Sequence, residues 1–189
     1  MRELTYYVAV TLDGRIAGPD GEFDAIPVTG DHIDMVFRDW RDTVPRVGLE
    51  AVGLEADGRR FDAVVMGWET YAAGLAATDD PYPHLDQYVF SRRHLDADVP
   101  AGITLTDEDP VALVRRLKAG EGVGIWLCGG GVLAGALIEE IDRLVLKVNP
   151  LVFGAGLPLF SGVYDPRSFV LERSTPYASG VIVNEYRRA

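Results

Sequence analysis

The stretch that decides the fold class runs from Trp126 to Leu146 and reads WLCGGGVLAGALIEEIDRLVL. It begins inside an apolar run, VGIWLCG, which is typical of a buried strand and stops at three consecutive glycines. The following VLAGALIEEID predicts a helix, because apolar residues recur on one face, namely Leu133, Ala136, Leu137 and Ile141. The next apolar run, RLVLKVN, predicts another strand. This succession is typical of an α/β sheet protein.

The three glycines, Gly129, Gly130 and Gly131, have two interpretations. The first N–H groups of a helix attract anions, and glycines let a phosphate approach the backbone. Gly129, Gly131 and Ala134 also match the dinucleotide pattern G-x-G-x-x-G/A. A Rossmann domain beginning here is rejected, because only 58 residues follow Gly131 and RLVLKVN ends without an acid for the ribose. A pyrophosphate site and a tight turn that binds nothing remain as alternatives.

Strands and helices alternate outward from this unit. The predicted strands are 4–12, 61–67, 86–93, 103–107 and two within 168–188, and the predicted helices are 31–40, 68–77 and 108–120. Asp109, Pro110 and Gly120 suit the cap, first position and end of the last helix. Residues 41–60 are glycine-rich and predict no definite element. The alternation predicts one domain over 1–189 with a mainly parallel sheet, whose ligands bind outside the carboxyl ends of the strands.

Composition limits the classes of function. The chain has 189 residues, 48% of them apolar, and a net charge of −11, which argues against nucleic acid and against an anionic membrane surface as partners. The one cysteine, Cys128, permits no disulfide within the chain and fits a reducing cytoplasm. The sequence has no cluster with metal-ligand spacing, no signal-peptide pattern and no apolar run that approaches the ~20 residues of a membrane span.

Two further strand ends carry polar groups that suit a nucleotide. In VVMGWETY, Gly67 ends a strand and Thr70 follows near a helix start, where its hydroxyl can cap the helix or donate to a phosphate. In YVFSRR, Ser91 and Arg92 end another strand, and a solvated strand end is the alternative interpretation. Since carboxyl ends of parallel strands share one edge, we expect these junctions to converge with the glycines on one site.

The three junctions, in this order and spacing, resemble the dihydrofolate reductase-like superfamily. They most resemble the reductase domain of bifunctional riboflavin deaminase–reductases, the RibD C-terminal family, and its stand-alone relatives. The matching stretches are VAVTLDGRIAG, VVMGWETY, VFSRR, WLCGGGVLAGALIEEIDRLVLKVNPLVFGAGLPLF and GVIVNEYRR. The resemblance implies a three-layer α/β/α fold whose central sheet has about eight strands, mostly parallel with an antiparallel C-terminal strand. It also implies NADPH as the hydride donor.

The resemblance also implies positions for the cofactor. Ala9 and Ile16 would flank the nicotinamide, while Ser91 and Arg92 would lie by the adenosine end, where arginine can favour a 2′-phosphate. The residues that would approach the phosphates are Gly67, Thr70, Gly129, Gly130, Gly131, Val132 and Leu133.

The sequence departs from the family at the second junction. Where the family usually has G-R-K-T, this chain has Gly67-Trp68-Glu69-Thr70, which removes two positive charges and adds one negative charge beside a polyanion. Trp68 is a candidate to stack on adenine instead, and we expect NADP to be preferred over NAD. The zinc signature of the partner deaminase is absent, so this chain cannot deaminate by that route.

The substrate side gives fewer signals. Asp31 and Asp34 lie near the first-helix carboxylate that supplies a proton in dihydrofolate reductases. The alternatives are a helix cap, which suits Asp31 in particular, and a solvated helix face. Asp13 matches a family position near the active centre, with ordinary turn chemistry as the alternative. Phe37 and Trp40 suit either a stacking role or the core, and Cys128 suits a small buried hydrophobe better than a catalytic thiol. The loop VNPLVFGAGLPLF suits either a sheet edge or a dimer contact, and we expect a homodimer.

These observations predict an NADPH-dependent reductase acting on a small heterocyclic or ribosylamino substrate. The resemblance favours 5-amino-6-(5-phosphoribosylamino)uracil, the intermediate of riboflavin biosynthesis. One alternative is a reductase of dihydrofolate or another pterin. Another is a catalytically inactive NADP-binding module, which the altered pair Trp68-Glu69 makes credible.

Overall fold

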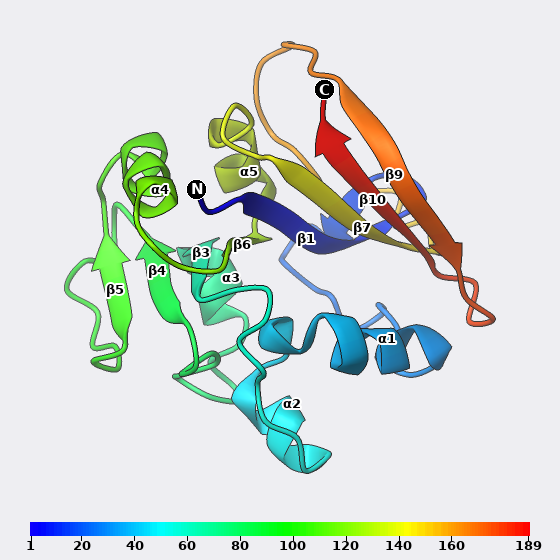
Figure 1. Cartoon of the computed structure of the whole chain (residues 1–189), viewed down its shortest axis with the longest axis horizontal. Coiled ribbons are helices and arrows are strands. Elements are labelled where there is room, and N and C mark those ends of the chain that lie inside the picture. The colour runs from blue at the N-terminus through cyan, green and yellow to red at the C-terminus, as the bar shows by residue number, and fades with distance from the viewer.

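The computed structural model describes residues 1–189, and its centre is one eight-stranded sheet (Figure 1). In spatial order the strands are β5 (Ile103–Thr106), β4 (Asp86–Phe90), β3 (Ala63–Gly67), β6 (Ile125–Gly129), β1 (Leu4–Thr11), β7 (Arg143–Asn149), β10 (Ile182–Arg188) and β9 (Phe169–Pro176). The six strands from β5 to β7 are mutually parallel, whereas β10 is antiparallel to both β7 and β9. The predicted mostly parallel sheet with an antiparallel C-terminal strand is therefore confirmed.

Helices cover both faces of the sheet. The helices are α1 (Asp31–Asp39), the short 3₁₀ helix η1 (Arg41–Thr43), α2 (Arg46–Ala51), α3 (Trp68–Ala72), α4 (Pro110–Ala119) and α5 (Gly131–Ala136). Figure 1 shows α1 and α2 on one side of the sheet and α4 and α5 on the other. Each side has its own apolar core, because strand side chains alternate between the faces and each face buries them against its helices.

The strand order places a crevice near the glycines. From β1 the chain crosses to β3, continues outward through β4 to β5, and then returns to insert β6 between β3 and β1. The direction of winding therefore reverses around β6. Ligands of open α/β sheets bind at such a reversal, outside the carboxyl ends of the strands. Gly129 ends β6 at this point, and Gly67 ends its neighbour β3.

The structure differs from the sequence-based expectation in several short elements. The helix predicted over 132–142 begins at Gly131 but ends at Ala136, and turns lead from there into β7. Two strands that were not predicted, β2 (Arg15–Ala17) and β8 (Leu157–Pro158), pair only with each other. By contrast, the predicted boundaries of α4 are confirmed, because Asp109 accepts a hydrogen bond from the Ala112 N–H at 2.8 Å and Gly120 ends the helix.

Residues 41–60, which predicted no element, are organised by one buried carboxylate. The Asp42 side chain is 1% exposed and accepts hydrogen bonds from four backbone N–H groups, those of Asp57, Gly58, Arg60 and Phe61. This side chain supplies the acceptors that a loop without regular structure otherwise lacks. The loop is thereby fixed beside α1 and α2. None of the helices has the length and apolar character needed to cross a membrane.

Candidate functional site

Two of the three predicted junctions meet directly. Thr70, in α3, faces the end of β6, and a methyl group added to Gly129 would lie 3.6 Å from its Oγ1 atom. A methyl group added to Gly130 would lie 3.7 Å from the same Oγ1 atom and 4.0 Å from Ile16 Cδ1. The Thr70 hydroxyl makes no hydrogen bond within the chain. Residues from β2, β6 and α3 thus surround one short stretch of open backbone.

The three consecutive glycines serve different purposes. Gly129 has φ of 149°, a conformation that residues with a side chain rarely adopt, and its peptide bond to Gly130 is cis. Gly130 is extended, and a Cβ atom there would make only ordinary contacts with Thr70 and Ile16. Gly131 instead packs against the chain itself, since a methyl group there would overlap the Pro158 carbonyl oxygen. Only the first two glycines therefore leave the backbone open toward a ligand.

The first turn of α5 presents few groups to a ligand. The Ala134 N–H donates to the Gly130 carbonyl at 2.9 Å, which is the first hydrogen bond of the helix, so the preceding N–H groups lack helical acceptors. Val132 is 76% exposed, whereas the Leu133 side chain is buried in the core beneath α4 and α5. Any cofactor contact of Leu133 is therefore limited to its backbone.

The junction after β4 forms a compact turn beside Trp68. The Ser91 hydroxyl oxygen accepts hydrogen bonds from the backbone N–H groups of Arg93 and His94, and it lies 3.1 Å from His94 Nδ1. The His94 ring stacks on the Trp68 indole with centroids 4.3 Å apart and an interplanar angle of 8°. One face of Trp68 is thus already covered, which leaves only the other face for an adenine ring. Arg92 is exposed and forms no ion pair.

Asp13 has a structural position in the β1–β2 turn. Its carboxylate accepts hydrogen bonds from the Thr11 hydroxyl at 2.6 Å and from the backbone N–H groups of Phe153 at 3.1 Å and Gly154 at 2.8 Å. The bond from Thr11, joined by the two backbone bonds, lowers the pKa of Asp13 to about 2. The group is ionised at neutral pH and ties the turn to the loop after β7, which matches the turn interpretation and leaves no proton to donate.

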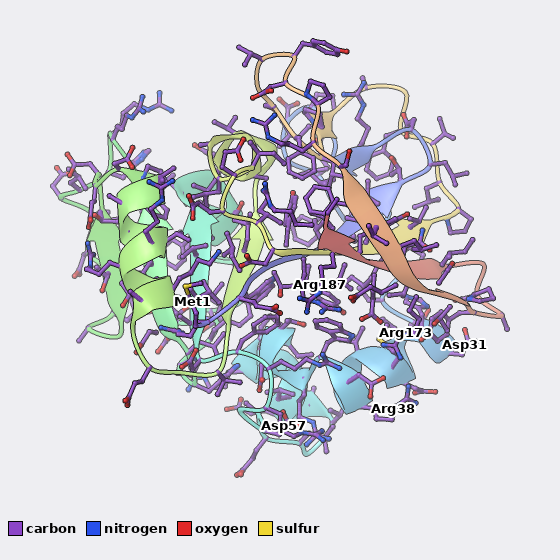
Figure 2. All side chains as sticks on the ribbon, turned by 45° about the horizontal axis from the view of Figure 1, so that its top comes forward. Met1, Asp31, Arg38, Asp57, Arg173 and Arg187 are labelled. Carbon is purple, nitrogen blue, oxygen red and sulfur yellow. The ribbon has the colours of Figure 1, made fainter.

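Asp31 connects α1 to the β9–β10 hairpin. Its carboxylate accepts hydrogen bonds from the backbone N–H groups of Ala178 at 2.7 Å and Ser179 at 3.0 Å, and the first of these bonds lowers its pKa. Figure 2 shows Asp31 at the end of α1 beside this hairpin. The N-cap interpretation is wrong, because Gly30 occupies the N-cap position and Asp31 is the first helical residue. Both of its oxygen atoms are engaged away from the strand-end crevice.

On one face of the central strands, three half-buried residues border a region that we call the hollow. Ala9 on β1, Cys128 on β6 and Lys147 on β7 are all half-buried, although these strands are interior to the sheet. Ala9 pairs with Lys147 in the register of β1 and β7. The strand residues one step before them on the same face, Tyr7 and Val145, are fully packed against α1. The small Ala9 side chain therefore leaves room between the thiol and the ammonium group.

An apolar cavity of about 240 Å³ adjoins this hollow. Cys128 and Thr70 both line it, and Thr70 also faces Gly129 and Gly130 at the end of β6. Burial raises the pKa of the Cys128 thiol to about 12, so the group stays protonated and is a poor nucleophile at neutral pH. The remaining lining residues carry no charge: they are Phe23, Pro45, Val47, Met66, Tyr71, Ala73, Gly74, Ala77, Thr78, Pro81 and Tyr82.

The residues at the strand ends fit a dinucleotide. A Cβ atom at Gly67 would meet no atom within 4 Å, and those at Gly129 and Gly130 would meet only ordinary contacts, so the backbone there is free to approach a ligand. The free Thr70 hydroxyl can donate to a phosphate, and Ile16 lies next to Gly130 where an apolar ring wall is required. Glu69, the negative charge in this junction, is exposed to solvent.

The sheet topology identifies the general fold of the chain. The fold is that of dihydrofolate reductase: the enzyme from Enterococcus faecalis, in its complex with NADP(H) and RAB-propyl, superposes over 98% of this chain and 96% of its own with a TM-score of 0.68 at 16% identity. A candidate riboflavin biosynthesis protein from Shewanella sp. PV-4 superposes over 100% of this chain and 99% of its own, with a TM-score of 0.74 and 25% identity.

Within that class, the chain belongs to the RibD C-terminal domain family, whose profile matches residues 2–183. The uncharacterized protein YwjB of Bacillus subtilis (strain 168) is 29% identical over 189 residues, which is 98% of each chain. The family consists of NADPH-dependent reductases and typically binds NADP(H). The family predicted from the three junctions is therefore confirmed.

Three residues of the site escaped the sequence analysis. His94 lies three residues after Ser91 and carried no pattern of its own. Lys147 sits inside the apolar run RLVLKVN, where a single lysine interrupting a strand that is otherwise apolar was the available signal. Tyr82, in the loop before β4, lines the cavity beside Cys128, and only tertiary packing brings the two together.

Proposed function

We propose that this chain is a cytoplasmic NADPH-dependent reductase of the RibD C-terminal type. The observation that carries the proposal is the convergence of Thr70 and Ile16 on the open backbone of Gly129 and Gly130. NADPH, when bound, supplies the hydride, so the protein's task is chiefly to bind and orient. Ala9 and Ile16 would flank the nicotinamide, and Arg92 at the end of β4 would meet the adenosine phosphate.

The acceptor is proposed to be a small heterocycle of the 5-amino-6-(5-phosphoribosylamino)uracil kind. Family membership supports this choice, and so does the similarity to the riboflavin biosynthesis protein from Shewanella. The apolar cavity beside Cys128 supports an acceptor that is flat and small, since about 240 Å³ lies below the ~300–1,000 Å³ of most drug-sized sites. A dihydrofolate-type pterin is the second enzymatic candidate, supported by the shared fold.

Fluorescence titration tests the cofactor directly. Trp68 stacks on His94 beside the turn after β4, whereas Trp40 and Trp126 are buried in the core, so we expect NADPH to quench a signal that comes mainly from Trp68. NADPH should bind saturably and more tightly than NADH, and a Trp68→Phe variant should lose most of the signal while calorimetry still detects binding. The reductase proposal is wrong if neither dinucleotide binds.

A binding module without catalysis is distinguished by turnover. Asp13 and Asp31, the two carboxyl groups expected as proton donors, both accept hydrogen bonds from backbone N–H groups. This observation favours a binding module without catalysis. A reductase should oxidise NADPH at 340 nm in the presence of 5-amino-6-(5-phosphoribosylamino)uracil or dihydrofolate. Saturable NADPH binding without oxidation by either compound would favour the module or a different acceptor.

A further inference from the structure

Lys147, on the interior strand β7, is a cation that has no carboxylate partner. It forms no ion pair, whereas Lys118, the only other lysine, lies 2.7 Å from Asp142. Burial lowers the pKa of Lys147 to about 8, and the only other ionisable group that affects it is the Cys128 thiol. The ammonium group is therefore still mostly protonated at neutral pH. A half-buried cation of this kind lacks the partner that usually offsets its loss of water.

Aromatic rings hold the ammonium group in place. Lys147 Nζ lies 4.2 Å from the centroid of the Tyr7 ring, and Tyr7 stacks on Trp40 with centroids 4.5 Å apart and an interplanar angle of 14°. Since Trp40 covers one face of Tyr7, Lys147 lies against the other face. The cation–π contact fixes the position of the ammonium group but satisfies none of its N–H donors. These donors remain available to a ligand in the hollow above Ala9.

The cavity that adjoins the hollow contributes no further charge. All 13 residues that line it are uncharged, so a phosphate dianion there would meet at most the single positive charge of Lys147. Asp13 and Asp31 are bound to backbone groups elsewhere. A lysine donates three hydrogen bonds and accepts none, so its ligand must present an oxygen or nitrogen lone pair. The chemistry on this face suits a carbonyl-bearing ring.

We propose that Lys147 binds the acceptor molecule, and that this acceptor is a flat, uncharged heterocycle with a ring carbonyl, such as a pyrimidinedione, whose affinity lies in the ring and not in a phosphate. The inference rests on the proposed function, since it places the ring between Lys147 and the nicotinamide-side residues Ala9 and Ile16. A ribosyl phosphate on such an acceptor extends out of the cavity.

The position of Lys147 in the sheet, as well as its charge, suits it to bind the acceptor. The register of β1 and β7 sets Lys147 directly beside Ala9, and Ala9 faces the same side as Tyr7, two residues before it. The ammonium group of Lys147 and Ala9, which is predicted to flank the nicotinamide, are thus on neighbouring strands of the sheet. A ring held by its carbonyl at Lys147 is thereby held beside Ala9, which fixes the position of the acceptor carbon relative to the nicotinamide.

Calorimetry on protein saturated with NADP⁺ tests the proposal, with 5,6-diaminouracil and ribose 5-phosphate as probes. The uncharged ring should bind saturably and ribose 5-phosphate should not. Lys147→Met keeps the length and apolar stem of the side chain, and it should weaken binding of 5,6-diaminouracil about tenfold or more. Its Tm should not fall, and its NADP⁺ affinity should change less than about twofold.

The matched control is Arg116→Met, which removes one positive charge from α4 on the opposite face of the sheet. It should leave the binding of 5,6-diaminouracil unchanged. The proposal is overturned by unchanged ring affinity in Lys147→Met, by no binding of the ring to the wild type, or by tighter binding of ribose 5-phosphate. A wild type that fails to bind NADP⁺ would instead refute the proposed function, so the two failures are distinguishable.

Discussion

Replacing Gly131 with alanine should destabilise the fold. The added methyl group would overlap the Pro158 carbonyl oxygen and lie 3.3 Å from its carbon and 3.4 Å from Ser161 Oγ. Relief requires α5 to move away from the segment after β8, which strains or breaks the hydrogen bond from the Ser161 N–H to the Gly131 carbonyl at 2.9 Å. Overpacking costs about 1–3 kcal/mol, and the weakened hydrogen bond adds about 1 kcal/mol.

The expected loss is therefore about 2–4 kcal/mol in the free energy of unfolding. For a chain of this length, such a loss lowers Tm by about 4–16 °C, which differential scanning fluorimetry resolves, and urea denaturation measures the free energy itself. Gly162→Ala is the matched control, because Gly162 lies in the same segment but a methyl group there would meet nothing within 4 Å. Its Tm should stay the same or rise slightly, since alanine restricts the unfolded chain.

Gly130→Ala separates packing from binding. Its methyl group would make only ordinary contacts with Thr70 and Ile16, so its Tm should match the wild type while its NADPH affinity falls. Gly131→Ala should have a lower Tm than the wild type, but below that Tm it should bind NADPH with unchanged affinity. The reasoning is refuted if Gly131→Ala unfolds at the wild-type temperature, because then the contact with Pro158 does not explain that glycine.

Three further variants test the remaining assignments. Thr70→Val should raise the Kd for NADPH about tenfold or more at unchanged Tm, because it removes a hydroxyl expected to donate to a charged phosphate; calorimetry would contradict this if the Kd stayed within about twofold. Asp13→Asn should lower Tm at neutral pH. Because the pKa of Asp13 in the folded protein is about 2, below its ordinary value of 3.8, the stabilising effect present above pH 3.8 should vanish as the pH falls toward 2. A Tm difference from the wild type that does not shrink over this range would argue against the assignment. Asp42→Ala should cost about 2–4 kcal/mol by leaving four backbone donors without their acceptor, whereas a loss below about 0.5 kcal/mol in urea denaturation would show that water replaces the carboxylate.

The layered architecture was predictable because local and global signals agree in its main elements. The apolar runs of β1, β3 and β6 are buried on both faces, as interior parallel strands require, and they read as continuous hydrophobic stretches. The two ends of α4 were predictable because the capping residues Asp109 and Gly120 act on their immediate neighbours in the sequence. The convergence of Thr70 with Gly129 followed from the rule that parallel strands end at one edge.

The elements that were not predicted depend on contacts between distant parts of the chain. β2 and β8 are short and exist by pairing Arg15 with Pro158, across more than a hundred residues. Helix α2 is six residues long with Gly48 in its interior, so its intrinsic propensity is low. The loop that follows it depends on one buried side chain, Asp42. No local pattern distinguishes that aspartate from the other acidic residues of the chain.

The triple glycine shows the same limit within the site. Sequence alone treats Gly129, Gly130 and Gly131 as equivalent, because each lacks a side chain. The structure separates them by φ, by free space and by a close neighbour from a segment almost thirty residues away. Lys147 is likewise visible in the sequence, but its missing partner is a property of the folded sheet.

A crystal structure with NADP⁺ tests the central claim most directly, namely that the strand ends of β3, β4 and β6 hold a dinucleotide. We predict density for the phosphates against Thr70 and the Gly129–Gly130 backbone, with the nicotinamide between Ala9 and Ile16. The polar groove formed by Arg38, Asp39, Arg59 and Arg60 beside α1 offers the cofactor another charged surface. Density there, with the strand ends empty, would contradict the account.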